Sequence, residues 1–296
     1  SLNGFITYTD KYRFWGRYTN QIIDFRIGLQ KISFGQSLIL RPLNWFDTID
    51  FRLSTNQTLG VNAARLKYNP NNIYGIWGWI IDNDSKYPSY GMRLELSDNS
   101  GEWGFSYHVD NEDKIHFLNQ FNTISNSFNT DIIEGMDQIN IEELILFLSF
   151  NKNQKLGLDY RYDGDIGFYF EASRCIIENP TILNRIDLIS VGLDLTIPNT
   201  SIPITFSTET MYSYFLFENN VFFDFIDGTN TVFNLNLNID IINNLMILSV
   251  FDWDQEKFYN YLKWSNLYDY FNIDVMLSLN PKSVGNSIEL MFVYNH

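Results

Sequence analysis

The stretch FRIGLQKISFGQSLILRPLNWFDTID, residues Phe25–Asp50, decides how the rest of the chain is interpreted. Around its first part, apolar and polar side chains alternate, which is the period of a β-strand with one apolar and one polar face. The alternation sets Ile23, Phe25, Ile27 and Leu29 against Asp24, Arg26, Gly28 and Gln30. The second part contains Pro42, which cannot donate to a central β-ladder, and then Trp45 and Phe46. The stretch therefore predicts a half-polar strand that leads into a structured loop.

The same alternation recurs along most of the chain, with turn sequences such as Asp98–Gly101 and Asp163–Asp165 between the segments. The clearest alternating segments are Tyr90–Leu96, Trp103–Val109, Leu156–Tyr162, Ile166–Ala172, Ile189–Ile197, Phe233–Ile239, Phe271–Leu279 and Ile288–Tyr294. They are close to the roughly 9–11 residues that a tilted strand needs to cross a bilayer. Short turns alternate with longer polar segments at 82–89, 110–141 and 252–267, a pattern that is typical of outer-membrane barrels.

These patterns predict an all-β chain, an antiparallel transmembrane β-barrel of about 14 strands, within a range of roughly 12 to 16. No linker divides residues 1–296, so we expect a single domain, and a start at Ser1 indicates a processed or trimmed N-terminus. Short loop helices are expected at 254–271 and at 130–143. Residues 73–81 are apolar on both faces, which predicts a strand covered on its inner side by a loop, and a place for a subunit contact.

Composition narrows the classes of function. The formal net charge of −15 argues against nucleic-acid binding, which needs a basic surface. The single cysteine, Cys175, excludes an internal disulfide framework, and no apolar run reaches the roughly 20 residues of a membrane-spanning helix. Aromatic residues make up 17% of the chain and gather toward strand ends, as amphipathic rings do at the two membrane–water interfaces.

Two alternatives stay open at this point. One is a structural outer-membrane anchor whose lumen is plugged by residues 34–60 and 110–141. The other is a soluble β-sandwich that binds carbohydrate through exposed tryptophans, because antiparallel sheets in soluble proteins also alternate.

No pattern indicates catalysis, a metal site or a cofactor. Ser106 and His108 share a strand face, but residues two apart lie roughly 6–7 Å from each other, beyond nucleophile–base hydrogen-bonding distance. Asp163 and Asp165 flank a glycine between two strands, which favours a turn over a pair of catalytic carboxylates. We therefore expect a protein that is not an enzyme.

From Arg26 to Asp47 the chain resembles a recurring segment of bacterial outer-membrane porins, the alginate-export-like porins and related poorly characterised porins. In these families an Arg-x-Gly-Arg-Gln strand leads to a Trp-Gly pair and then to an Asn-Pro-hydrophobic-Asp/Asn-x-Phe loop. Here Leu29 replaces the second arginine, Phe34 replaces the tryptophan, and Arg41 stands where asparagine is common. Residues 61–68 look like the next strand. The resemblance implies a bacterial outer-membrane location and a channel, and porins are commonly homotrimers; the sequence leaves the oligomeric state open.

We therefore expect a channel for passive diffusion of small hydrophilic solutes or ions, in contact with outer-membrane lipids and with mild cation preference. Charged residues on the polar strand faces and in the loop, together with one glutamine, are the candidate pore-lining and constriction residues. They are Asp24, Arg26, Gln30, Arg41, Arg65, Arg93, Glu95, Asp159, Arg161, Glu171 and Asp194. An alternative interpretation is that these are paired or water-exposed wall residues without a role in selectivity.

Overall fold

The computed structural model describes residues 13–46, 60–82, 87–111, 152–178, 180, 183–197, 202–217, 225–282 and 284–294. Within them the chain forms a 15-stranded antiparallel sheet, in which every strand pairs with its neighbours in sequence. The strands are β1 Phe14–Thr19, β2 Ile23–Gln30, β3 Val61–Tyr68, β4 Tyr74–Ile81, β5 Ser89–Asp98, β6 Gly101–Asp110, β7 Asn153–Tyr162, β8 Gly167–Ile177, β9 Leu183–Ile197, β10 Ile204–Phe217, β11 Phe225–Asn238, β12 Asn243–Asp252, β13 Lys257–Leu267, β14 Phe271–Leu279 and β15 Ser287–Tyr294. The all-β prediction is confirmed, and the strand count falls within the predicted range.

None of the residues that the structure describes forms a helix, and so none of them forms a helix able to cross a membrane.

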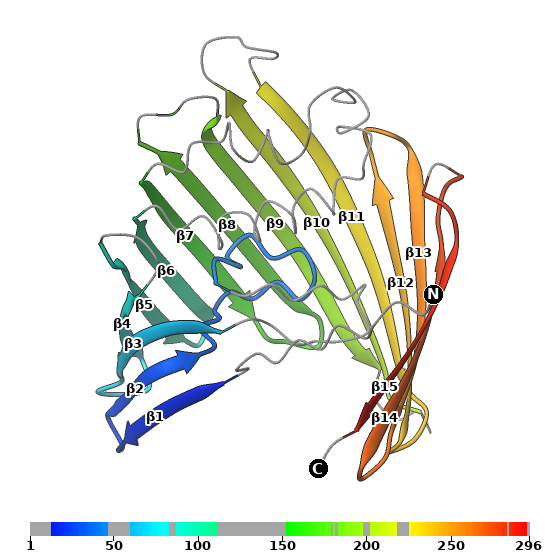
Figure 1. Ribbon diagram of the computed structural model, residues 1–296, viewed down its shortest axis with the longest axis horizontal. Helices are drawn as coiled ribbons and strands as arrows, with labels where there is room; N and C mark the ends of the chain where they lie inside the picture. Colours follow the sequence, from blue (N-terminus) through cyan, green and yellow to red (C-terminus); the bar gives the residue numbers. More distant parts are fainter. Residues whose placement is uncertain are drawn as a thin grey trace, which may run out of the picture.

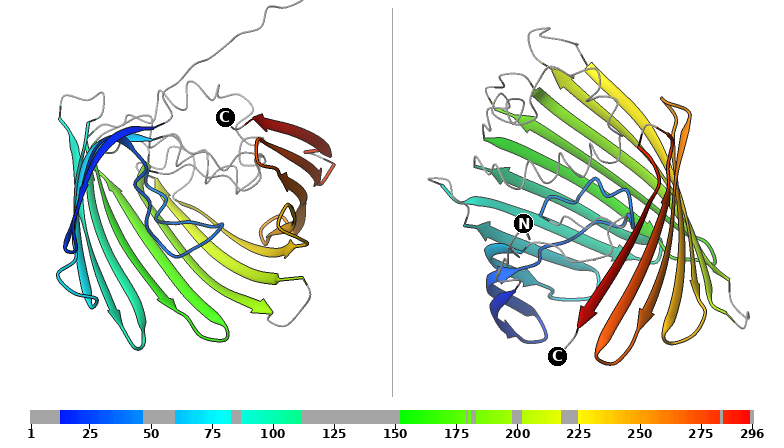
Figure 2. Two further views of the ribbon diagram at one scale, coloured as in Figure 1. Left: turned by 90° about the horizontal axis from the view of Figure 1, so that it is seen from below. Right: turned by 45° about the vertical axis from the view of Figure 1, so that its right-hand side comes forward.

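The sheet curls into a strongly curved wall that encloses an interior, with β1 and β15 on either side of an opening (Figures 1 and 2). Among the described strands, β1 pairs only with β2 and β15 pairs only with β14. The described sheet is therefore not the closed barrel that the sequence predicted. The odd number of described strands explains part of this difference. Successive antiparallel strands alternate in direction, so the first and fifteenth strands run in the same direction and cannot pair with each other in antiparallel fashion.

The connections differ between the two ends of the sheet. Each connection from an odd-numbered to the following even-numbered strand is short, and three of them begin with the same turn. Asn20, Asn71 and Asp240 each accept hydrogen bonds, through one side-chain oxygen, from the N–H groups two and three residues later, at 2.7–3.0 Å. Asn and Asp favour such turns because their side chains can bond to nearby backbone. The connections 31–60 and 111–152 are the longest between the described strands, and both follow even-numbered strands, so they begin at the opposite end of the sheet.

Two predictions for residues 252–271 are wrong. The chain there forms a tight turn at 253–256 and then the strand β13, in place of a long loop or a helix. In β13, Tyr259 and Lys263 are buried, whereas Phe258 and Trp264 are exposed, so the period is two. Aromatic rings on both faces conceal this alternation in the sequence. The helix predicted at 130–143, and all of the predicted loop at 110–141 beyond residue 111, lie outside the described residues.

The two faces of the sheet are inverted relative to a soluble protein. The convex face exposes large apolar side chains, among them Ile27, Met92, Phe105, Val191 and Ile247. The concave face buries polar and charged groups, among them Arg65, Arg93, Lys155, Asp159, Glu171 and Glu209. In a water-soluble sheet the apolar face is the one that is covered.

Candidate functional site

Residues 31–46, which we call the inserted segment, follow β2 and lie on the concave side of the sheet (Figures 1 and 2). The segment contains neither helix nor strand, which confirms the loop predicted around Pro42. It is nevertheless well covered, since Ile32, Leu43 and Trp45 are each exposed by 2% or less. A loop without regular structure needs acceptors for its buried N–H groups, and these come from the strand wall.

Glu171 in β8 supplies the first set of acceptors. Its Oε1 accepts hydrogen bonds from the backbone N–H of Gln36 and, at 2.5 Å, from that of Ser37. Its Oε2 accepts from the N–H of Leu43 at 3.2 Å. Gly35 makes this approach feasible, because it has a φ of 98° and the Glu171 carboxylate occupies the place where a Cβ atom would lie. Glu171 therefore fastens the inserted segment at two points.

Glu209 in β10 supplies the second set. It accepts from the N–H groups of Leu38 at 2.6 Å, Ile39 at 3.0 and 3.1 Å, and Leu40 at 2.5 Å. The hydroxyl of Tyr169 donates to the same carboxylate at 2.8 Å. Five consecutive backbone N–H groups, those of residues 36–40, thus end on two wall carboxylates. Such acceptor-only contacts suit ionised carboxylates.

The far end of the inserted segment makes an apolar contact with the opposite part of the sheet. Leu40 packs in one buried cluster with Met211 of β10, Val232 of β11 and Leu248 of β12. The inserted segment therefore extends from β2 to β12 along the inner wall.

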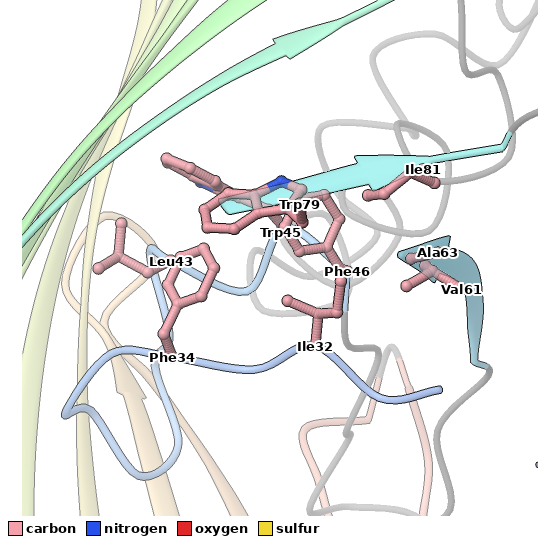
Figure 3. Packing of buried hydrophobic residues seen from close by; sticks show 9 residues of the cluster. All are labelled: Ile32, Phe34, Leu43, Trp45, Phe46, Val61, Ala63, Trp79 and Ile81. Carbon is pink, nitrogen blue, oxygen red and sulfur yellow. The ribbon is translucent and has the colours of Figure 1, made fainter. Parts of the chain in front are cut away.

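Both halves of the inserted segment carry aromatic rings that pack on β4 and β6, Phe34 on the way out and Trp45 and Phe46 on the way back. Phe34 and Trp45 meet edge to face at 5.4 Å, and Phe34 lies 5.5 Å from Trp79. Phe46 meets His108 edge to face at 4.8 Å. We call these five side chains the aromatic cluster; Figure 3 shows its phenylalanines and tryptophans with the aliphatic side chains around them.

Hydrogen bonds fix the orientation of two of these rings. Trp45 Nε1 donates to Ser173 Oγ at 3.1 Å, and Trp79 Nε1 donates to His108 Nδ1 at 3.2 Å. Gly157 of β7 leaves room for the inserted segment, because a Cβ atom there would lie 3.1 Å from the Trp45 ring. The prediction that strand 73–81 is covered on its inner side is confirmed, since Trp79 packs against the inserted segment.

A first group of predicted pore-lining charges, Asp24, Arg26 and Arg65, meets on β2 and β3 and is joined by Arg17 of β1. Asp24 forms ion pairs with Arg17 at 3.0 Å, with Arg26 at 3.2 Å and with Arg65 at 3.9 Å. Three guanidinium groups thus share one carboxylate, which makes this side of the inner wall locally positive.

A second group lies deeper, on β5 to β7. Arg93 donates to both oxygens of Asp159, at 2.6 and 2.9 Å, and to Ser106 Oγ at 2.9 Å. Arg93 also donates to Glu95 at 3.1 Å, which in turn pairs with Lys67 at 2.9 Å. Arg93 is 2% exposed and Asp159 is fully buried. This pair is therefore a desolvated ion pair, whereas Lys67 keeps access to the interior.

A third group connects the turn 163–166 with β9. Arg161 pairs with Asp194 at 2.9 Å and with Asp163 at 2.6 Å, and its guanidinium lies 5.5 Å from the centre of the Tyr169 ring.

Two of the predicted pore-lining residues, Gln30 and Arg41, form hydrogen bonds with other groups of the protein. Gln30 is buried and donates through Nε2 to the carbonyl oxygen of Ala63 at 2.8 Å. Arg41 donates to Ser33 Oγ at 2.8 Å, a contact inside the inserted segment. The structure thus brings the predicted charges into ion-paired groups and assigns Glu171 to loop attachment; their part in selecting solutes stays a prediction.

The sequence interpretation missed three inner-wall groups. Glu209 and Tyr169 hold the inserted segment, and Lys155 forms a buried ion pair with Asp110 at 3.2 Å. The available signal for Glu209 was its place in the alternating segment Ser207, Glu209, Met211 and Ser213, all of which are buried. Nothing in the sequence indicated that a carboxylate there would bind the backbone of residues 38–40.

The catalytic candidates do not assemble a reactive site within the described residues. His108 accepts from Trp79 and Ser106 accepts from Arg93, so the two side chains have separate partners. Asp163 and Asp165 lie in the turn between β7 and β8, as predicted, and Asp163 forms an ion pair with Arg161 at 2.6 Å. No group of three or more His, Cys, Asp or Glu side chains suited to a metal ion occurs in the described parts of the chain.

Comparisons with protein-family models, with curated proteins and with solved structures find no match to this chain.

Proposed function

We propose that this chain forms the wall of a β-barrel in the bacterial outer membrane and passes small hydrophilic solutes or ions by diffusion. In this proposal the inserted segment narrows the lumen, and the ion-paired groups on β2 to β9 line the remaining passage.

The inversion of the two faces is the observation that carries this proposal. Phe105 and Ile27 on the convex face are 44% and 56% exposed, while Arg93 and Asp159 on the concave face are 2% and 0% exposed. Contiguous apolar surface of this extent is unusual for soluble monomers. A lipid environment accounts for it, because transmembrane barrels alternate apolar side chains outward with polar side chains inward.

The architecture bears on the alternatives. A β-sandwich needs two stacked sheets, whereas the described strands belong to one sheet. The plugged anchor keeps a specific observation in its favour, because the inserted segment and the aromatic cluster fill the interior beside β4 to β8. Liposome swelling with small sugars separates the channel from the anchor, because a plugged barrel would admit none.

Membrane insertion places a requirement on β1 and β15. Open sheet edges are not tolerated in contact with lipid hydrocarbon, because their N–H and C=O groups have no water to bond. An antiparallel closure needs one further strand, or another odd number, which also restores the even count of bacterial barrels. The proposal therefore includes a partner strand between β1 and β15.

A matched pair of arginine substitutions tests the lipid-facing surface. Val191→Arg lies on the exposed face of β9, whereas Ile241→Arg lies in the turn 239–242 and is 98% exposed. In a bilayer the first substitution should cost about 2–4 kcal/mol near the midplane and the second almost nothing. The fraction of each variant that inserts into lipid vesicles measures this cost, and planar-bilayer recording then measures the ionic current of the inserted protein. Equal insertion of the two variants, or insertion without stepwise ionic current, would contradict the proposal.

A further inference from the structure

A pocket of about 430 Å³ lies on β3 to β6, beside the inserted segment. Gln36 of the inserted segment, Lys67 of β3, and Arg93 and Glu95 of β5 are among its lining residues. Its volume is in the range of pockets that take small organic ligands.

The charges around the pocket balance. Its charged lining residues are two cations, Lys67 and Arg93, and two carboxylates, Glu95 and Glu102. Glu95 is held by three donors, since it accepts from Lys67 at 2.9 Å, from Trp77 Nε1 at 2.9 Å and from Arg93 at 3.1 Å. A charged ligand would have to compete with these internal pairs, whereas a neutral polar ligand can use the donors and acceptors that they present.

Amide groups complete the polar lining. Asn69, Asn71 and Asn72 of the β3–β4 turn line the pocket together with Gln36. An amide carries both donors and an acceptor, which is what a hydroxyl group needs. Asn71 offers only its NH₂ group, because its Oδ1 already accepts from the N–H groups of Ile73 and Tyr74. Gly75 provides the space for one of them, because a Cβ atom there would lie 2.5 Å from Asn69 Oδ1.

We infer that this pocket binds an uncharged mono- or disaccharide as it passes the inserted segment. The inference rests on the proposed channel for its biological role, but the binding itself depends only on the pocket. Balanced fixed charges and several amides match a ligand that carries many hydroxyl groups and no net charge.

Two glycines on β4 provide the test and its control. Gly75→Ala would push the Asn69 amide out of its position, whereas Gly78→Ala places a methyl group where no atom lies within 4 Å. Binding of glucose, maltose, glucuronate and glucosamine to the detergent-solubilised full chain is measured by isothermal titration calorimetry. Block of ionic current by the same four probes is measured separately in planar bilayers.

We expect the unaltered chain to bind the neutral sugars more tightly than the charged ones. Gly75→Ala should weaken the binding of the neutral sugars about tenfold, which corresponds to the loss of one or two hydrogen bonds. Gly78→Ala should leave their binding unchanged. Asn69→Asp, which adds a negative charge without adding bulk, should shift the preference toward glucosamine. Preference of the unaltered chain for a charged probe, or absence of binding in a chain that conducts, would overturn the inference. Sugar binding that responds to Gly75→Ala in a chain without ionic current would uphold it and refute the channel.

Discussion

The attachment of the inserted segment to Glu171 and Glu209 can be broken without changing the shape of either side chain. Glu171→Gln and Glu209→Gln keep the volume but replace one acceptor oxygen by an NH₂ group, which faces backbone N–H donors. Glu171 accepts three backbone hydrogen bonds and Glu209 accepts from three backbone N–H groups and Tyr169. The contacts that hold residues 36–40 are therefore the ones that the substitutions remove.

The magnitude follows from the number of bonds. A hydrogen bond to a charged group contributes about 1.5–3 kcal/mol, roughly twice a neutral one. Neutralising one carboxylate with three or four such bonds should weaken the attachment by about 3 kcal/mol, or about a hundredfold in the ratio of attached to released segment. Because Ser37 and Leu38 are adjacent but held by different carboxylates, the double variant should release the segment by more than either single variant.

Thiol accessibility measures this release directly. Ser37→Cys, in a Cys175→Ala background, places a thiol at a position that is 5% exposed. A charged methanethiosulfonate reagent should react slowly with this thiol when both carboxylates are present and much faster in the double variant, with a parallel rise in single-channel conductance. Asp194→Asn is the matched control for each single variant, because Asp194 pairs with Arg161 and its replacement removes one negative charge, as Glu171→Gln and Glu209→Gln each do. Unchanged reactivity in the double variant, or an equal change in Asp194→Asn, would refute the attachment model.

Three further predictions concern the wall. Gly35→Ala should detach the inserted segment much as Glu171→Gln does, because Gly35 has a φ of 98° and the Glu171 carboxylate occupies the place of its missing Cβ atom. The same thiol assay measures this release, and a thiol reaction as slow as in the unaltered segment would contradict the prediction. Asp159→Asn leaves the Arg93 guanidinium in a buried site without its full counter-charge. The substitution should therefore lower the free energy of unfolding by about 3 kcal/mol in urea titrations of the lipid-inserted chain. A loss below about 1 kcal/mol, the value of an exposed ion pair, would show that the site is solvated. Cysteine pairs placed along β1 and β15, in the Cys175→Ala background, should not form disulfides but should be joined by a crosslinker of about 10 Å. If one further strand lies between β1 and β15, the two strands are separated by twice the spacing of neighbouring strands. Efficient disulfide formation would instead indicate that β1 and β15 pair directly, in parallel.

Much of the wall follows from local sequence. The period-two alternation of segments such as Ile23–Gln30 and Ile288–Tyr294 specifies strands, because a strand that separates an apolar from a polar environment must place them on opposite faces. The predicted turns Asp98–Gly101 and Asp163–Asp165 join β5 to β6 and β7 to β8, and the first contains a hydrogen bond from the Ser100 N–H to Asp98 Oδ1, two residues earlier. These features depend on neighbours along the chain, so the sequence alone was sufficient to predict them. The wrong prediction at β13 also has a local cause, because aromatic rings on both faces of this strand conceal its two-residue alternation.

The path of the inserted segment, residues 31–46, required the tertiary structure. Pro42 indicated a loop, but its course depends on Glu171 and Glu209, which lie more than a hundred residues away in sequence. Those carboxylates look like ordinary polar wall residues until the sheet curls and brings them beneath residues 36–40. The order and register of the strands pair Arg93 of β5 with Asp159 of β7, and the packed interior places Trp79 in the same buried cluster as Trp45. Contacts of this kind depend on the curvature of the sheet and on the alignment of separate strands, which no local pattern encodes. The strands themselves are determined by the alternation that the chain carries throughout.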